Sequence, residues 1–181
     1  MEIPVQIIAL VEEQTSLNPI VVLHDRGADR VLPIWIGDAE ARAIAVALNN
    51  IETPRPLTHM LFLSLSEKVG ATIERIVIDR MEEHTYFATI YLNQGEKIHA
   101  IDARPSDAIA IALTRKVPIF VHEKVMNSAG QKNPFPHVPA GDASAGQEQG
   151  KHRKIELSKV DLERIANVLK KAQEREQKAG G

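Results

Sequence analysis

Short apolar runs and amphipathic segments alternate along the first 130 residues. Strands are predicted where β-branched and apolar residues dominate, or where apolar and polar residues alternate. These segments are residues 3–11, 20–25, 31–36, 71–79, 85–93, 97–101 and 117–122. Apolar residues at helical spacing predict helices at residues 39–49, 57–69, 105–115 and 123–129. Because tight turns join the strands between residues 71 and 101, we expect an α+β fold with a mixed, largely antiparallel sheet.

Two of the predicted strand-to-helix junctions resemble each other. Residues 43–48 read Ala-Ile-Ala-Val-Ala-Leu, and residues 108–113 read Ala-Ile-Ala-Ile-Ala-Leu. Each of these small-residue helices follows a strand through a carboxylate-rich corner. The repeat predicts an approximate internal duplication, with two similar halves packed together. Alanine-rich helices allow close approach, and such surfaces often lie at subunit interfaces, so we expect a homo-oligomer with a dimer as the first choice.

The pattern changes after residue 130. Residues 131–154 are rich in proline and glycine, which predicts a flexible linker. Residues 155–181 predict an amphipathic helical tail whose apolar positions recur at helical spacing. Those positions are Leu162, Ile165, Ala166, Leu169 and Ala172. The tail therefore needs a partner, which is the 1–130 domain, another copy of the chain or another protein.

Composition narrows the function classes. The 181-residue chain has no cysteine, which excludes disulfides, thiolate zinc sites and cysteine nucleophiles and indicates a cytoplasmic protein. No segment resembles a membrane span or a signal peptide. The net charge of −2 gives no global sign of nucleic-acid binding. Residues 151–178 nevertheless hold nine Lys/Arg and five Asp/Glu, a charge of +4, against −6 for the remaining residues.

The segments in this order resemble a known family. The matching motifs are Leu-Pro-Ile-Trp-Ile-Gly at residues 32–37, Pro-Arg-Pro-Leu-Thr-His at 54–59 and Ile-Asp-Ala-Arg-Pro-Ser-Asp-Ala-Ile-Ala at 101–110. Together they resemble the bifunctional nuclease domain family over residues 1–130. The resemblance implies phosphodiester hydrolysis in both RNA and DNA, with nucleic acid as the substrate.

Candidate site residues cluster around the two corners. Hydrolysis of a phosphodiester needs an activated water, stabilisation of phosphoryl charge and a protonated leaving group. The candidate catalytic residues are Asp102, Arg104, Asp107, Glu40 and His59. Arg55 and Arg104 are the candidate substrate-binding residues. Candidate ligands for Mg²⁺ or Mn²⁺, both of which prefer oxygen donors, are Asp38, Glu40, Asp102 and Asp107.

Each candidate also has a purely structural interpretation. Asp38 and Asp107 are predicted to lie in the first turns of two helices and to act mainly as caps there, where a carboxylate stabilises the exposed N–H groups and the helix dipole. Ser106 is also predicted to act as a cap. Asp102 shares a strand face with Ile98 and Ala100, so it is predicted to point inward and to pair with Arg104 or another arginine.

The remaining polar and aromatic candidates have structural interpretations too. His59 can simply bond to backbone. Four aromatic residues could stack bases, although aromatic residues on strands more often belong to a core. They are Trp35, Tyr86, Phe87 and Tyr91, and no interleaved basic residues flank them in sequence.

Two functions remain open at this point. The first is a nuclease of low sequence preference, with its site where the two corners meet and with Arg55 and His59 at the rim. The second is a non-catalytic oligomerising regulatory or scaffold module, in which the charged corners are structural ion pairs and the tail binds a protein or nucleic-acid partner.

Overall fold

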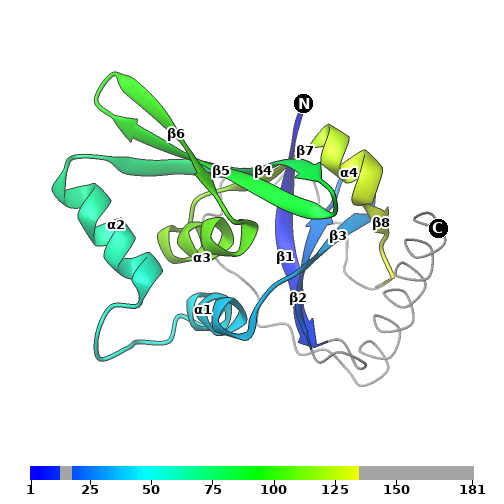
Figure 1. The fold of residues 1–181 in the computed structure, drawn as a ribbon, viewed down its shortest axis with the longest axis horizontal. Coiled ribbons are helices and arrows are strands. Elements are labelled where there is room, and N and C mark those ends of the chain that lie inside the picture. The colour runs from blue at the N-terminus through cyan, green and yellow to red at the C-terminus, as the bar shows by residue number, and fades with distance from the viewer. Residues whose placement is uncertain (13–17, 135–181) are drawn as a thin grey trace.

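The computed structural model describes residues 1–12 and 18–134 and contains an eight-stranded sheet with four helices (Figure 1). The strands are β1 (Glu2–Glu12), β2 (Pro19–Asp25), β3 (Arg30–Trp35), β4 (Thr72–Glu82), β5 (Thr85–Gln94), β6 (Lys97–Ala103), β7 (Ile119–His122) and β8 (Gln131–Lys132). The helices are α1 (Asp38–Leu48), α2 (Thr58–Lys68), α3 (Pro105–Arg115) and α4 (Glu123–Ala129). The predicted α+β class is confirmed.

The strand order reveals the duplication. The order is β6-β5-β4-β7-β1-β2-β3-β8, so an antiparallel meander β1-β2-β3 leads into α1 and a second meander β4-β5-β6 leads into α3. β7 lies between the two meanders, parallel to β4 and antiparallel to β1. The sheet is therefore mixed but largely antiparallel, as predicted.

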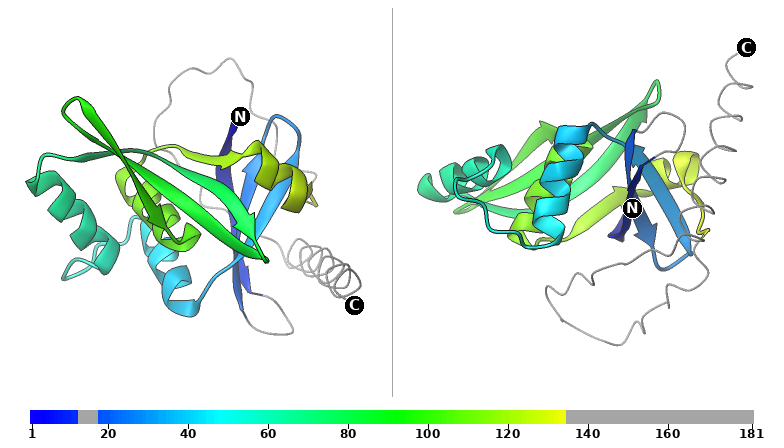
Figure 2. Two further views of the ribbon diagram at one scale, coloured as in Figure 1. Left: turned by 45° about the horizontal axis from the view of Figure 1, so that its top comes forward. Right: turned by 90° about the horizontal axis from the view of Figure 1, so that it is seen from below.

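The two small-residue helices pack against each other on one face of the sheet. α1 and α3 lie side by side, and α2 lies beyond α3 (Figures 1 and 2). Small side chains make α3 an internal helix, since Ala108, Ala110 and Ala112 are all buried. The alanine surface of α3 is thus used within the chain, and it does not supply the exposed dimer surface that its composition suggested.

Asp38 and Asp107 lie in the first turns of α1 and α3 as predicted, but neither they nor Ser106 occupies the cap position. Gly37 is the residue before the first turn of α1, and Asp38 is the first helical residue. Arg104 occupies the corresponding position before α3, and neither helix has a side-chain cap hydrogen bond. Ser106 is instead buried within the first turn of α3. A proline at the first helical position of α3 leaves this helix with one fewer unpaired backbone amide at its start.

The described part of the chain continues past residue 130, which is the end of the domain predicted from the sequence pattern. Gln131 and Lys132 form β8, which pairs with Val31 and Arg30 of β3. The rest of the predicted linker and the whole predicted tail lie outside the described residues. None of the helices within residues 1–12 and 18–134 is long and apolar enough to cross a membrane.

Candidate active site at the two corners

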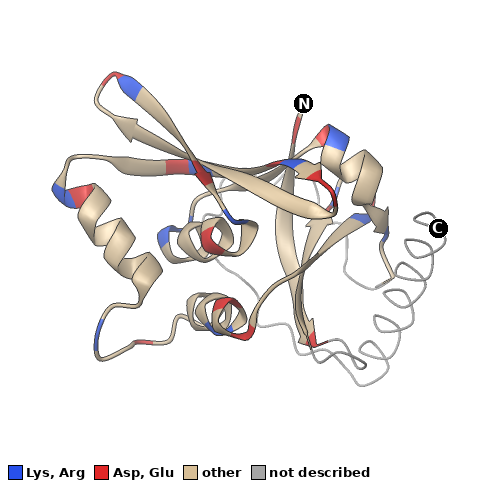
Figure 3. Cartoon of the chain, viewed as in Figure 1, with Lys and Arg blue, Asp and Glu red and all other residues tan. Residues whose placement is uncertain are grey.

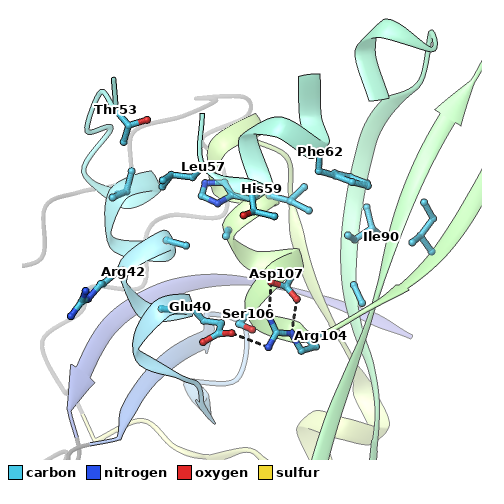
Figure 4. A pocket seen from close by; sticks show the side chains of 18 of the residues that line it. Glu40, Arg42, Thr53, Leu57, His59, Phe62, Ile90, Arg104, Ser106 and Asp107 are labelled. Carbon is cyan, nitrogen blue, oxygen red and sulfur yellow. Dashed lines mark hydrogen bonds and ion pairs between the residues drawn. The ribbon is translucent and has the colours of Figure 1, made fainter. Parts of the chain in front are cut away.

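Arg104 joins the two strand-to-helix corners. It follows β6, and its Nη1 donates to Glu40 Oε1 of α1 at 2.8 Å. Its Nε and Nη2 donate to the two carboxylate oxygens of Asp107 in α3, at 2.7 and 3.0 Å (Figure 4). Because α1 packs on α3, residues 64 positions apart in the sequence form one cluster. The predicted meeting of the corners is therefore observed for Glu40, Arg104 and Asp107.

The arginine retains unused binding capacity. The two carboxylates raise the pKa of Arg104, and Asp107 has the larger effect and Glu40 the smaller. The guanidinium is therefore permanently charged. A guanidinium carries five N–H donors, and the contacts described use three of them. Its side chain is 65% exposed, so the remaining donors can reach a ligand from solvent. This geometry suits a phosphate, which arginine can bind through two parallel hydrogen bonds.

His59 lies in the same cavity, at the start of α2. The cavity has a volume of about 820 Å³ and is lined by His59, Glu40, Arg104 and Asp107 as well as many apolar side chains (Figure 4). His59 is buried, and its Nε2 has no hydrogen-bond partner among residues 1–12 and 18–134. Burial lowers the pKa of His59, and the nearby charge of Asp107 only partly opposes this effect. The imidazole is therefore neutral at pH 7 and can accept a proton.

The walls of this cavity are apolar, a feature that polar motifs in the sequence do not reveal. Phe62 of α2, Ile90 of β5 and Ile111 of α3 line it. A second cavity of about 580 Å³ shares Glu40, Arg104 and Ser106 with the first. The ion pair between Glu40 and Arg104 therefore lines both cavities.

Asp102 does not point inward as predicted. It is opposite Thr89 of β5 and its side chain is 72% exposed, although the residue is among those that line the cavity of Arg104 and His59. Its carboxylate pairs with Arg80 of β4 at 3.2 Å, so the partner is the alternative arginine and not Arg104. The inference that Asp102 shares a face with Ala100 is correct, but that face is the outer one.

Two other predicted residues stand apart from the cluster. Asp38 and Arg55 are exposed and do not line the cavity. Arg55 lies in the proline-rich loop between α1 and α2, and the Thr53 hydroxyl donates to its carbonyl at 2.9 Å. Acidic and basic positions are scattered over the described part of the chain, and both kinds occur near the two corners (Figure 3).

Arginines cover two of the aromatic rings that were considered for base stacking. Arg75 lies 3.8 Å from the ring centre of Tyr91, and Arg80 lies 4.1 Å from that of Phe87. These arginines come from the neighbouring strand β4, which is why no basic residue flanks the rings in sequence. They are themselves paired with carboxylates, so this face shows no excess of positive charge.

The candidate metal ligands do not converge. No group of three or more His, Asp or Glu side chains within residues 1–12 and 18–134 is arranged to hold a metal ion. Glu40 and Asp107 both bind the Arg104 guanidinium, which occupies the position between the two carboxylates. The side chains at the corners therefore do not form a ready set of metal ligands.

Comparison with known proteins gives consistent similarities. A model of the bifunctional nuclease domain matches residues 21–134. An uncharacterized protein of Mycobacterium tuberculosis is 40% identical over 126 residues, or 70% of this chain and 75% of that protein. Bifunctional nuclease 1 of Oryza sativa subsp. japonica is 33% identical over 119 residues, and Bifunctional nuclease 2 of Arabidopsis thaliana is 30% identical over 118. The match spans 64% of this chain and only 36% of either plant protein.

Proposed function

The chain belongs to the bifunctional nuclease domain family, and from that membership we propose that it is a nuclease that hydrolyses phosphodiester bonds in RNA and DNA. Low sequence preference is part of the proposal, because the cavity at the corners offers charge and apolar walls and few groups that could read base edges. The absence of cysteine supports a cytoplasmic location.

The observation that carries this proposal is the conjunction of Arg104 and His59 in one cavity. Arg104 uses its remaining donors to bind a phosphoryl oxygen and to stabilise the charge that develops there. Glu40 and Asp107 hold the guanidinium in place and are positioning residues. Neutral His59, whose Nε2 has no partner among the described residues, takes the proton from the attacking water, and the imidazolium so formed returns a proton to the oxygen that leaves as the P–O bond breaks.

Cleavage of labelled single- and double-stranded RNA and DNA tests the proposal. Wild type, His59→Gln and His99→Gln are assayed side by side with EDTA, Mg²⁺ or Mn²⁺. His99 is the matched control because it is an exposed histidine on β6. We expect wild type and His99→Gln to cleave at similar rates and His59→Gln to lose about 100-fold, as for removal of a general base. Equal rates for all three proteins would contradict the role of His59.

A second candidate function is the oligomerising module, and an apolar stripe on α2 favours it. Leu61 and Leu65 of α2 and Val69, which directly follows the last residue of α2, recur at every fourth position and are 61%, 62% and 57% exposed. In this alternative the stripe binds the same stripe of a second copy, and the ion pairs at the corners are structural. No cleavage by wild type under any condition, together with a dimer that Leu65→Glu converts to a monomer in light scattering, would favour this function.

A further inference from the structure

A second apolar cluster lies on the sheet face opposite to α1 and α3. It consists of six aliphatic residues from β1, β2 and β3, which we call the outer cluster. They are Ile8, Ala9, Val11, Ile20, Val22 and Val31, which are 0–6% exposed. Trp35, at the end of β3, packs against them. The pairing of β1 with β2 is irregular between Ile7 and Ala9. Because of this irregularity, the residues of β1 that follow Ile7 contribute to this face as well as to the main core.

The described helices do not account for this burial. The buried apolar side chains of α1, α2, α3 and α4 belong to the main core on the other face of the sheet. Within residues 1–12 and 18–134, no residue of a helix belongs to the outer cluster. Yet all seven residues of β2 are buried. A strand that is buried on both faces needs a layer on each, because an uncovered antiparallel sheet face remains accessible to water.

The chain leaves the described region at the rim of this face. Asn133 follows β8, and its Nδ2 donates to Asp29 Oδ1 at 2.7 Å. The same amide lies 3.4 Å from Nε2 of His24. His24 alternates with Ile20 and Val22 along β2, so it shares their face. Residues 135–181 therefore begin beside the outer cluster.

We propose that residues 158–172 form an amphipathic helix that docks on the outer cluster through Leu162, Ile165 and Leu169. A helix of 15 residues is about 22 Å long, close to the length of a seven-residue strand. The 23 residues between Pro134 and Ser158 can extend to about 75 Å, so reach does not limit docking. The tail is thus the missing layer of the domain.

Charge and tethering favour this segment over a separate partner. Residues 151–178 carry +4 and the other residues −6, so the tail is attracted to its own domain while two domains repel each other. Covalent attachment also gives the tail an effective concentration on the order of millimolar at the docking face. Docking leaves the basic side chains of the helix facing solvent, on an otherwise acidic molecule.

The single tryptophan reports on docking in the full chain. Trp35 is the only tryptophan and packs against the outer cluster. We expect Leu162→Asp/Leu169→Asp to shift its fluorescence emission to longer wavelength and to raise acrylamide quenching at least twofold. The control is Arg164→Asp/Lys171→Asp, which makes a larger change of charge on the polar side of the same helix. Unchanged fluorescence in the leucine variant would overturn the proposal.

Cysteine cross-linking identifies the occupant, since the natural chain has no cysteine. Ala9→Cys on the outer cluster and Ala166→Cys on the apolar side of the tail are combined in one full-length variant. Oxidation is expected to give an intramolecular disulfide, seen as a faster-migrating monomer that reductant restores. A covalent dimer would instead assign the face to a second copy, and no cross-link would indicate another protein. Either of these results overturns the proposal, and neither depends on nuclease activity.

Discussion

The ion pair between Glu40 and Arg104 joins the two halves of the domain, and its strength can be measured. We propose a double-mutant cycle of Glu40→Ala and Arg104→Ala. The pair is short, at 2.8 Å, with Glu40 22% and Arg104 65% exposed. Exposed ion pairs contribute about 0.2–1 kcal/mol, and the half-buried carboxylate places this one at the upper end, at about 1 kcal/mol of coupling. The coupling is expected to fall in 1 M salt, where the screening length is about 3 Å.

Urea unfolding of the four proteins provides the coupling free energy. The control cycle uses Glu67 and Arg115, which also join two helices, at 2.7 Å, but are 48% and 42% exposed. We expect the control coupling to be about half as large or less. A coupling of zero for Glu40 and Arg104, or one that salt leaves unchanged, would refute the argument that this pair joins the corners.

Two further predictions concern His59 and Asp102. Burial lowers the pKa of His59 below 6.5 in the folded state. At pH values just below 6.5 the unfolded state therefore binds more protons than the folded state. The free energy of unfolding should then fall as the pH drops through that range. His59→Gln should show a shallower fall in urea midpoints between about pH 5 and pH 8; an equal slope would mean that burial of His59 is not the cause of the fall. Asp102→Asn should keep cleavage within about twofold of wild type, since its carboxylate pairs with Arg80 on the outer face. A loss as large as that of a catalytic variant would assign a catalytic role to the Asp102 carboxylate, since the residue also lines the cavity.

Local pattern was sufficient to predict most of the elements. The helix predicted at residues 105–115 has the same bounds as α3, and the helix predicted at 123–129 has those of α4. Their signals are local: a proline at the first helical position, and apolar residues at helical spacing. The repeated Ala-Ile-Ala motif likewise predicted two related halves, which the strand order confirms.

The errors arose where long-range packing decides. Strand alternation places Asp102 and Ala100 on one face, but it cannot say which face the helices cover. The pairing of Glu40 with Arg104 depends on how α1 packs on α3, which no short segment specifies. The apolar walls of the cavity, such as Phe62 and Ile90, carry no polar signal that would mark them as part of a site.

The most direct test of the central claim compares Arg104→Ala with Arg115→Ala on one labelled single-stranded RNA. Arg104 directly precedes α3 and Arg115 is its last residue; both form carboxylate ion pairs, but of the two only Arg104 lines the cavity. We expect Arg104→Ala to lose about 100-fold or more in cleavage rate, as for removal of a group that stabilises developing charge, while Arg115→Ala remains near wild type. Equal cleavage by both variants would contradict the assignment of the site to the two corners.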